Sequence, residues 1–279
     1  MSGIGQLIFG TAGLSALPTQ GRALRLLEEA YYGGIRHFDT APLYGQGYAE
    51  WVLGRFLARK GQEVLITGKF GLAAGVSPTL DPRLAMPLNY IRKRFRGTQR
   101  GRTQALSGGD PATPAWRRIT REQVESSFNG SLKRLGCARL ECFLIHEGLP
   151  SFLDDEARTW LLRRQSAGAI GSLGVAAPAN ALLGLSAGDL EGFEVLQYEA
   201  GSIFEELMLR YPEKRHFLHS CFSKRNADGM TIPPSEVLSY WSRRNPEGKL
   251  LFFTRRPAVL RENIAGIQTN QASEGHALH

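Results

Sequence analysis

Four polar side chains in the N-terminal part of the sequence are of types that move protons: Asp39, Tyr44, Lys69 and His146. Asp39, Lys69 and His146 each stand at the end of a short apolar run of strand length, and Tyr44 follows Asp39 in the next loop. A tyrosine or histidine in such a place is most often only packed and hydrogen-bonded. A lysine there is unusual, because burying an ammonium group is costly unless a counter-charge pairs with it. Asp39 can supply that charge, so the four residues together predict a catalytic cluster.

The four residues belong to a chain in which strand-length apolar runs alternate with amphipathic helical stretches. The predicted strands are residues 6–12, 36–41, 63–70, 140–146, 170–177, 193–200, 215–222 and 249–255. The predicted helices are residues 21–34, 48–61, 119–136, 152–168, 179–186, 202–210, 233–245 and 257–269. Strands that alternate with helices imply a parallel sheet. Eight such units indicate an α/β protein with the closed (β/α)8 TIM barrel, a fold of about 250 residues whose active sites form at the C-terminal ends of the strands.

An open doubly wound sheet is the alternative, but it should carry a glycine fingerprint after a strand. The segments GIGQLI at residues 3–8 and GQGYAE at residues 45–50 both lack the third glycine. We therefore predict one barrel domain over residues 1–279, with a short disordered tail at residues 270–279. Residues 71–119, rich in proline and glycine, follow the third strand as an insertion at the face where active sites form.

Composition is that of an ordinary globular protein, with 42% hydrophobic and 22% charged residues, which argues against intrinsic disorder. The net charge of +8 is concentrated in the basic stretch at residues 91–104, which has one aromatic residue and no zinc or RNA-binding pattern. We interpret that stretch as a solvated loop or a contact for a small anion, and expect no nucleic-acid partner.

Membrane, disulfide and metal interpretations also find little support in the sequence. No apolar run approaches the roughly 18 residues of a membrane span, and residues 1–18 lack the basic start of a signal peptide, so we expect a cytoplasmic chain without a membrane partner. Three cysteines without paired spacing suggest reduced thiols. His216 and His219, three apart on one predicted strand, face opposite ways, so we expect no metal site. Glu147, directly after His146, is interpreted as a solvated loop acid, with a second titrating group as the alternative.

Several segments resemble the aldo-keto reductase family. GIRHFDTAPLYGQGYAEWVLG at residues 34–54 resembles the family motif around its catalytic aspartate and tyrosine, and VLITGKF resembles the strand that carries its lysine. SLKRLGCARLECFLIH at residues 131–146 is similar to the passage into its catalytic histidine. The APLYGQG form is most similar to the branch that contains bacterial aldose and pyridoxal dehydrogenases. The resemblance spans nearly the whole chain outside residues 71–119 and the tail.

This resemblance implies an oxidoreductase that transfers a hydride between NADP(H), with NAD(H) possible, and an aldehyde, ketone or sugar hemiacetal. Tyr44 would exchange the proton with the carbonyl oxygen. A free phenol has a pKa of about 10, and we expect the Lys69 ammonium to lower the pKa of Tyr44. Asp39 would keep Lys69 charged, and His146 would donate a hydrogen bond to the carbonyl oxygen. The oligomeric state is left open.

The resemblance also implies a set of cofactor contacts at the ends of the later strands. The expected cofactor-binding residues are Gln197, His219, Thr254, Arg255, Glu262 and Asn263. Arg255 would hold the 2′-phosphate of NADP, although Arg256 is an alternative from the residues alone. Ala176 and Ala177 stand where the family has a serine and an asparagine that hold the nicotinamide amide, so Gln197 would hold it alone. These two alanines favour a second interpretation, a regulatory or interaction protein that binds the cofactor with weak turnover.

Overall fold

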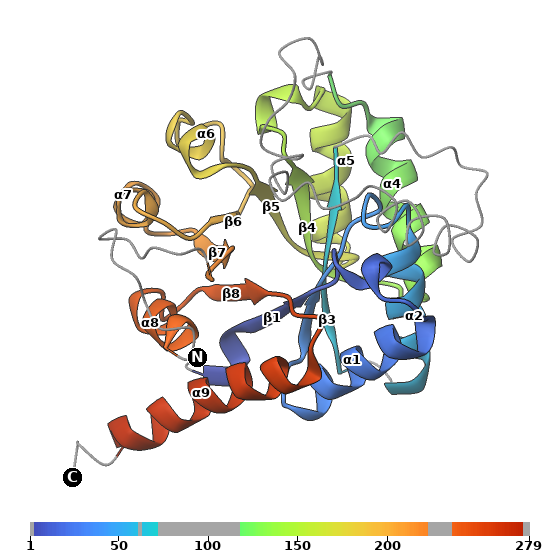
Figure 1. The fold of residues 1–279 in the computed structure, drawn as a ribbon. Helices are drawn as coiled ribbons and strands as arrows, with labels where there is room; N and C mark the ends of the chain where they lie inside the picture. Colours follow the sequence, from blue (N-terminus) through green and yellow to red (C-terminus); the bar gives the residue numbers. More distant parts are fainter. Residues whose placement is uncertain (1–2, 61–62, 72–117, 223–235, 276–279) are drawn as a thin grey trace, which may run out of the picture.

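The chain forms a closed barrel of eight parallel strands, as the computed structural model shows for residues 3–60, 63–71, 118–222 and 236–275 (Figure 1). The strands are paired in chain order, and β1 closes the barrel against β8. Their bounds are β1 Leu7–Gly10, β2 His37–Asp39, β3 Leu65–Phe70, β4 Leu140–His146, β5 Ile170–Ala176, β6 Val195–Glu199, β7 Arg215–His219 and β8 Lys249–Phe252. The (β/α)8 barrel predicted from the alternation of strands and helices is confirmed.

Helices surround the barrel and follow the strands along the chain (Figure 1). Their bounds are α1 Gln20–Tyr32, α2 Tyr48–Lys60, α4 Arg121–Leu135, α5 Asp155–Ser166, α6 Ala179–Leu183, α7 Phe204–Arg210, α8 Val237–Arg244 and α9 Pro257–Gly275, with short 3-10 turns at Gly3–Gln6, Leu14–Ala16 and Pro150–Phe152. None of the helices within these described ranges is both long and apolar enough to cross a membrane.

Local sequence chemistry accounts for the ends of α4. The backbone N–H of Thr120 donates to Oε1 of Gln123 at 3.1 Å, half of the capping box that the sequence predicts. The helix stops at Gly136, whose φ of 67° lies in the left-handed region that glycine adopts without steric cost. At the C-terminus, α9 is described through Gly275, and the disordered tail expected at residues 270–279 stays a prediction. Residues 72–117, most of the predicted insertion, lie outside the described residues.

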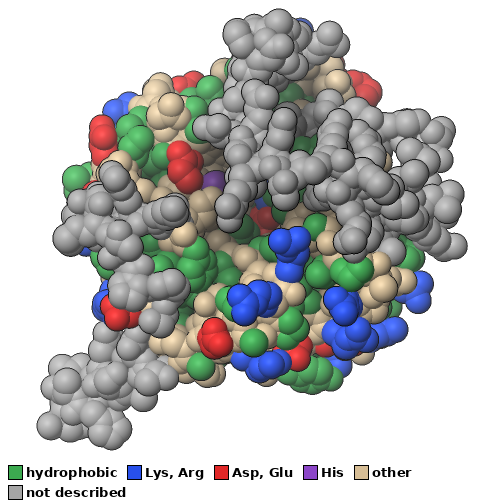
Figure 2. Space-filling model, in the orientation of Figure 1, with side chains coloured by type: hydrophobic (Ala, Val, Ile, Leu, Met, Phe, Trp, Pro, Cys, Tyr) green, Lys and Arg blue, Asp and Glu red, His purple; other side chains and the backbone are tan. Residues whose placement is uncertain are grey.

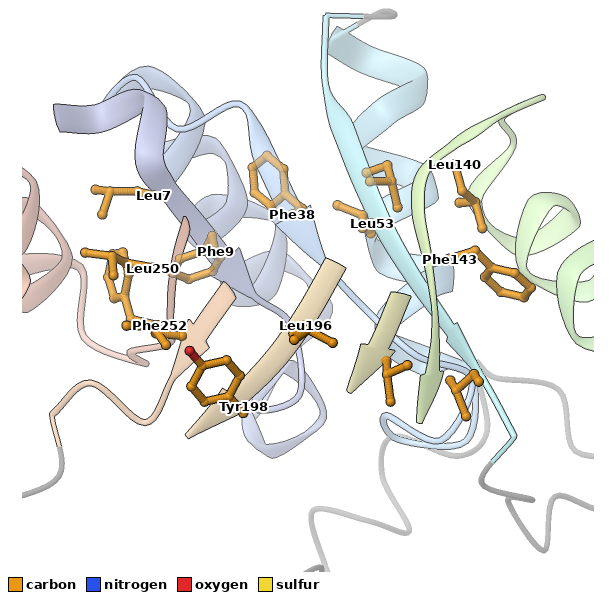
Figure 3. Close-up of a cluster of buried hydrophobic side chains, with 14 of the residues drawn as sticks. Leu7, Phe9, Phe38, Leu53, Leu140, Phe143, Leu196, Tyr198, Leu250 and Phe252 are labelled. Carbon is orange, nitrogen blue, oxygen red and sulfur yellow. The ribbon is translucent and has the colours of Figure 1, made fainter. Parts of the chain in front are cut away.

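Two sets of apolar side chains hold the barrel together. Outward-facing strand residues, among them Phe9, Phe38, Phe143 and Tyr198, pack under the helices (Figure 3). A smaller cluster fills the inside of the barrel with residues from alternate positions: Ile8, Cys142, Leu144, Ala176, Val195 and Phe217. The interior is therefore a packed core, and polar side chains that point inward at the strand ends must be accommodated at its mouth.

An ion pair between a buried carboxylate and a partly exposed guanidinium joins α2 to α4. Oε2 of Glu50, which is fully buried, accepts from Nε of Arg134 at 2.6 Å, and Oε1 accepts from the Ser131 hydroxyl at 2.7 Å. The two helices approach closely beside this pair, since a Cβ added to Gly54 would lie 2.3 Å from the carbonyl oxygen of Arg134. Burial raises the pKa of Glu50 above its ordinary value, although Arg134 and Ser131 oppose that rise.

Replacing Arg134 with methionine should destabilise the protein by about 3–5 kcal/mol, because it leaves the Glu50 carboxylate buried without its cation. The pKa of Glu50 should then rise further, so the folded state holds a proton that the unfolded state releases. The free energy of unfolding falls with rising pH wherever the folded state binds more protons. The destabilisation of the variant should therefore become smaller as the pH is lowered towards the ordinary pKa of glutamate. Urea unfolding at several pH values measures this.

The matched control is the exposed pair between Arg59 and Glu28, whose atoms are 3.4 Å apart. Arg59→Met should cost less than about 1 kcal/mol, the range of surface ion pairs. A loss for Arg134→Met that is equally small, or that does not change with pH, would contradict a structural role for the buried pair.

Candidate active site

The barrel brings the predicted catalytic side chains to the C-terminal ends of three adjacent strands. Asp39 is the last residue of β2, Lys69 lies next to the end of β3, and His146 is the last residue of β4. The register pairs Asp39 with Thr67 and Lys69 with Leu144, so Lys69 lies two residues beyond the partner of Asp39 and His146 lies two residues beyond the partner of Lys69. Tyr44 comes from the turn that leads into α2, and its position there places its hydroxyl over the strand ends.

Lys69 is the centre of this cluster. Its Nζ donates to Oδ1 of Asp39 and to the hydroxyl of Tyr44, the latter at 3.2 Å. The side chains of Lys69 and Asp39 are only 2% and 1% exposed, so water competes little for this ion pair. Burial alone would lower the pKa of Lys69, but Asp39 and Tyr44 together raise it above its ordinary value. Lys69 is therefore held as an ammonium group that contacts the phenol.

The pKa of Tyr44 departs from the value expected from the sequence. Lys69 does lower it, but burial of the phenol raises it by more, and the charges of Asp39 and Glu147 add to the rise. The pKa of Tyr44 is therefore raised, where we expected a net lowering. Tyr44 is buried beside Lys69, so two opposing effects act on its pKa. Removing the phenolate from water destabilises it by more than the Lys69 ammonium stabilises it. Tyr44 keeps its proton at neutral pH.

His146 completes the cluster as a neutral imidazole. Burial lowers its pKa to about 3, and the charge of Lys69 and the nearby His219 lower it in the same direction. Its ring lies edge-on to the ring of Tyr44, with the centroids 5.8 Å apart. A neutral imidazole carries one N–H donor, so His146 can give a single hydrogen bond to a group bound beside Tyr44.

The predicted nicotinamide contacts lie on β5, β6 and β7. Gln197 is 3% exposed, and its Nε2 donates to Oδ2 of Asp39 at 2.9 Å. Ala176 lies between His146 and Gln197 in the strand register and belongs to the interior cluster, whereas Ala177 packs in the outer cluster under the helices. His219 ends β7, is half-buried and has Nδ1 2.9 Å from the Ser220 hydroxyl; burial and Lys69 lower its pKa to about 4.

The residues expected to bind phosphate and adenine lie at the start of α9. Thr254 and Arg255 are between β8 and α9, and the backbone N–H of Arg256 donates to the Thr254 hydroxyl at 3.2 Å. Arg255 and Glu262 are exposed and Asn263 is half-buried. An exposed guanidinium at the N-terminus of a helix is suited to a phosphate group.

Backbone strain marks positions beside the cluster that the sequence analysis did not single out for strain. The described residues other than glycine with positive φ are Gln46, Glu147 and Ser220, with values of 57°, 53° and 55°. Glu147 and Ser220 directly follow His146 and His219, and strain of this kind clusters at functional sites. Glu147 is half-buried, and burial raises the pKa of its carboxyl group, which favours the alternative of a second titrating group beside His146.

Within the described ranges, no three histidine, cysteine, aspartate or glutamate side chains are placed to hold a metal ion. The surface shows a hollow on the face turned towards the viewer, with a histidine and an acidic side chain visible inside and lysine and arginine side chains below it (Figure 2). Titratable groups with shifted pKa values inside a concave, positively bordered site are typical of an active site.

A closed (β/α)8 barrel with this lysine, aspartate, tyrosine and histidine at its mouth defines a class of barrel oxidoreductases. The model of the aldo/keto reductase family matches residues 6–182. The chain belongs to this family, whose members use nicotinamide cofactors. The cluster was predicted from the resemblance and from residue types, and the structure adds the contacts that join its members.

Individual proteins are similar to this chain in sequence or in fold. A segment is 43% identical over 65 residues to pyridoxal 4-dehydrogenase from Microbacterium luteolum, which spans 22% of this chain and 19% of that protein. An aldo-keto reductase from Bacillus halodurans in its holo form has a TM-score of 0.66 at 15% identity, covering 94% of this chain and 86% of its own. A glycerol dehydrogenase from Gluconobacter oxydans has a TM-score of 0.62 at 16% identity, covering 93% and 85%.

Proposed function

We propose that this chain is an NADP(H)-dependent oxidoreductase that transfers a hydride between nicotinamide and a small aldehyde, ketone or sugar hemiacetal, with Tyr44 as the general acid and base. The observation that carries the proposal is the contact of Lys69 with both Asp39 and Tyr44 at the barrel mouth. A buried lysine that contacts a phenol adds little to the stability of the fold, because a hydrophobic side chain would fill the same space without the free energy needed to desolvate a charge.

The residues divide the proton chemistry among them. The nicotinamide cofactor supplies or accepts the hydride when it is bound. Tyr44 donates its phenolic proton to the oxygen of the carbonyl as charge develops there. Lys69 stabilises the phenolate that remains, and Asp39 keeps Lys69 charged and oriented. His146, neutral because its pKa is about 3, donates one hydrogen bond that positions the carbonyl oxygen. In the oxidative direction, Tyr44 takes the proton back from the alcohol.

The donors present fit a dinucleotide phosphate. Arg255 and the unpaired N–H groups that begin α9 would hold the 2′-phosphate, and Glu262 and Asn263 would meet the adenine. Near the cluster, His219 would contact the nicotinamide, and its low pKa of about 4 means that the imidazole would be neutral beside the oxidised ring. Gln197 would be shared between the nicotinamide amide and Asp39.

Arg255→Ala tests the cofactor preference. It should weaken NADPH binding by roughly 1.5–3 kcal/mol, the value of a hydrogen bond to a charged group, and leave NADH binding almost unchanged. Fluorescence titration of both cofactors against wild type and variant measures this, with Arg256→Ala as the matched control because Arg256 is also exposed and adjacent. Equal losses for the two cofactors, or a larger NADPH loss in Arg256→Ala, would remove Arg255 from the 2′-phosphate site.

A screen of aldehydes, ketones and sugars tests the reaction itself. Absorbance of the reduced cofactor is followed in both directions, with NADP(H) and NAD(H) in parallel. Pyridoxal and glycerol belong in the panel, because the names of two relatives refer to these molecules. Cofactor-dependent turnover that disappears in Tyr44→Phe supports the proposal.

A second candidate function rests on Ala176 and Ala177. These two apolar residues stand at the sequence positions of the serine and asparagine that hold the nicotinamide amide in the family, and Ala176 lies between His146 and Gln197 in the strand register. This suits a regulatory protein that binds the cofactor and turns over slowly. Tight NADPH binding without turnover on any substrate of the panel would favour this alternative. Turnover that increases when Ala176 and Ala177 are replaced by serine and asparagine would show how much the two alanines limit catalysis.

A further inference from the structure

The carboxylate of Asp39 is held from two opposite sides of the barrel. Oδ1 accepts from Lys69 on the neighbouring strand β3, and Oδ2 accepts from Nε2 of Gln197 on β6 at 2.9 Å. Because strands follow one another around the barrel in chain order, β2 and β6 lie across the mouth from each other. All three side chains are 3% exposed or less, so neither bond competes with bulk water. Each oxygen of the carboxylate thus has its own donor.

The neighbours of Gln197 explain why its amide is available to Asp39. Its register partner on β5 is Ala176 and its partner on β7 is Phe217, and neither has a side-chain hydrogen-bonding group. A buried amide nitrogen that found no acceptor would cost free energy, so donation to the charged oxygen of Asp39 is favoured. Bonds to an ionised acceptor are stronger than those between neutral groups.

We propose that Gln197 is a positioning residue that acts through Asp39: its amide fixes the carboxylate, and the fixed carboxylate keeps Lys69 charged and aimed at the Tyr44 hydroxyl. This role rests on the proposed function and adds to the contact with the nicotinamide amide that the resemblance implies. Without the second donor, Asp39 is free to rotate about its Cβ–Cγ bond, and its Oδ1 leaves the position that faces Lys69. The lysine then loses part of the charge that compensates its burial.

Other titratable groups at the mouth do not replace Asp39. Lys69 acts electrostatically on His37 on β2, His146 on β4 and His219 on β7, and Glu147 after β4 acts on Tyr44. The three histidines are neutral at pH 7, since burial, aided by Lys69, lowers their pKa values to about 3, 3 and 4. Glu147 acts on Tyr44 and is not hydrogen-bonded to Lys69 in the described structure. The charge of Lys69 therefore depends on Asp39.

A titration of Lys69 in the cofactor-free protein tests the proposal without any need for turnover. Lysine labelled with 13C at Cε is followed by NMR against pH, and the Lys69 resonance is assigned by its loss in Lys69→Met. Gln197→Leu should lower the pKa of Lys69 by about one unit or more, the scale of one hydrogen bond to a charged group. Gln197→Asn, which keeps an amide but shortens its reach, should lower it too and serves if the leucine variant does not fold.

Gln6→Leu is the matched control. Gln6, directly before β1, is also fully buried. Its Nε2 donates to the backbone oxygens of Asn245 at 3.0 Å and Pro246 at 2.8 Å. Gln6→Leu removes an equivalent buried amide at the other end of the barrel, and the pKa of Lys69 should stay as in the wild type. An unchanged pKa of Lys69 in both Gln197 variants, or an equal fall in Gln6→Leu, overturns the proposal.

Turnover and cofactor binding then separate the two roles of Gln197. In the reductive direction, Gln197→Leu should lower kcat and move its alkaline limb to lower pH, because Lys69 loses its proton earlier. A cofactor Kd that rises while Lys69 titrates as in wild type would assign Gln197 to the nicotinamide amide alone and overturn the positioning role. A chain without turnover on any substrate contradicts the proposed function, while the lysine titration still decides the contact with Asp39.

Discussion

Tyr44→Phe should reduce turnover on the order of 10²-fold or more, the scale of general acid and base catalysis. The substitution removes the phenolic proton and keeps the ring that packs edge-on against His146. Cofactor binding should stay near the wild-type value, because the hydroxyl contacts Lys69 rather than the residues expected to hold the dinucleotide. Steady-state rates with the best substrate of the panel, together with a cofactor titration, measure both effects.

Tyr198→Phe provides the control for the loss of a phenolic hydroxyl. Tyr198 is buried on β6 and its hydroxyl lies 2.7 Å from Nδ1 of His216, on the outward side of the barrel where the helices pack. Its removal should cost about 1 kcal/mol of stability, as for a typical hydrogen bond, with little effect on turnover. Near-normal turnover in Tyr44→Phe would exclude Tyr44 as the proton donor.

Lys69→Met should be as damaging to turnover as Tyr44→Phe and should also destabilise the fold. The methionine leaves the Asp39 carboxylate, 1% exposed, without its cation, and breaking a buried ion pair in this way costs about 3–5 kcal/mol. The phenolate of Tyr44 also loses the positive charge that lowers the pKa of the phenol. Chemical unfolding and steady-state kinetics on the same preparation report the two effects.

The double variant Lys69→Met with Asp39→Asn separates charge burial from catalysis. Removing the second charge should recover much of the lost stability, because no uncompensated ion remains, while turnover stays low. Recovery of turnover in the double variant would mean that Lys69 serves only to neutralise Asp39. A single variant that keeps wild-type stability would contradict the buried ion pair.

Much of this architecture follows from patterns that are local in the sequence. The alternation of strand-length and helical apolar patterns predicts the eight strand–helix units. The pair Thr120 and Gln123 predicts the start of α4, and Gly136 predicts its end. Asp39, Lys69 and His146 could be placed at one face because parallel strands of a barrel end together. The strand β7 is shorter than predicted, ending at His219, because the apolar residues Cys221 and Phe222 belong to the following turn and not to the sheet.

The remaining features depend on distances between residues that are far apart in the chain. The contact of Gln197 with Asp39 arises from the curvature of the closed sheet, which no local pattern encodes. The direction of the Tyr44 pKa depends on how much water the surrounding residues displace, and the positive φ of Glu147 depends on the hydrogen bond from its N–H to the Ala176 carbonyl at 2.7 Å.

The closure of β1 against β8 has a consequence for the synthesis of the protein. Ile8 pairs with Leu251, so the first strand to leave the ribosome waits for the last before its outer edge is covered. Until then the growing sheet carries two open edges of apolar strands, and such edges template aggregation. Contacts between residues so far apart also form slowly. The sheet is therefore free of open edges only after β8 has been synthesised and paired with β1.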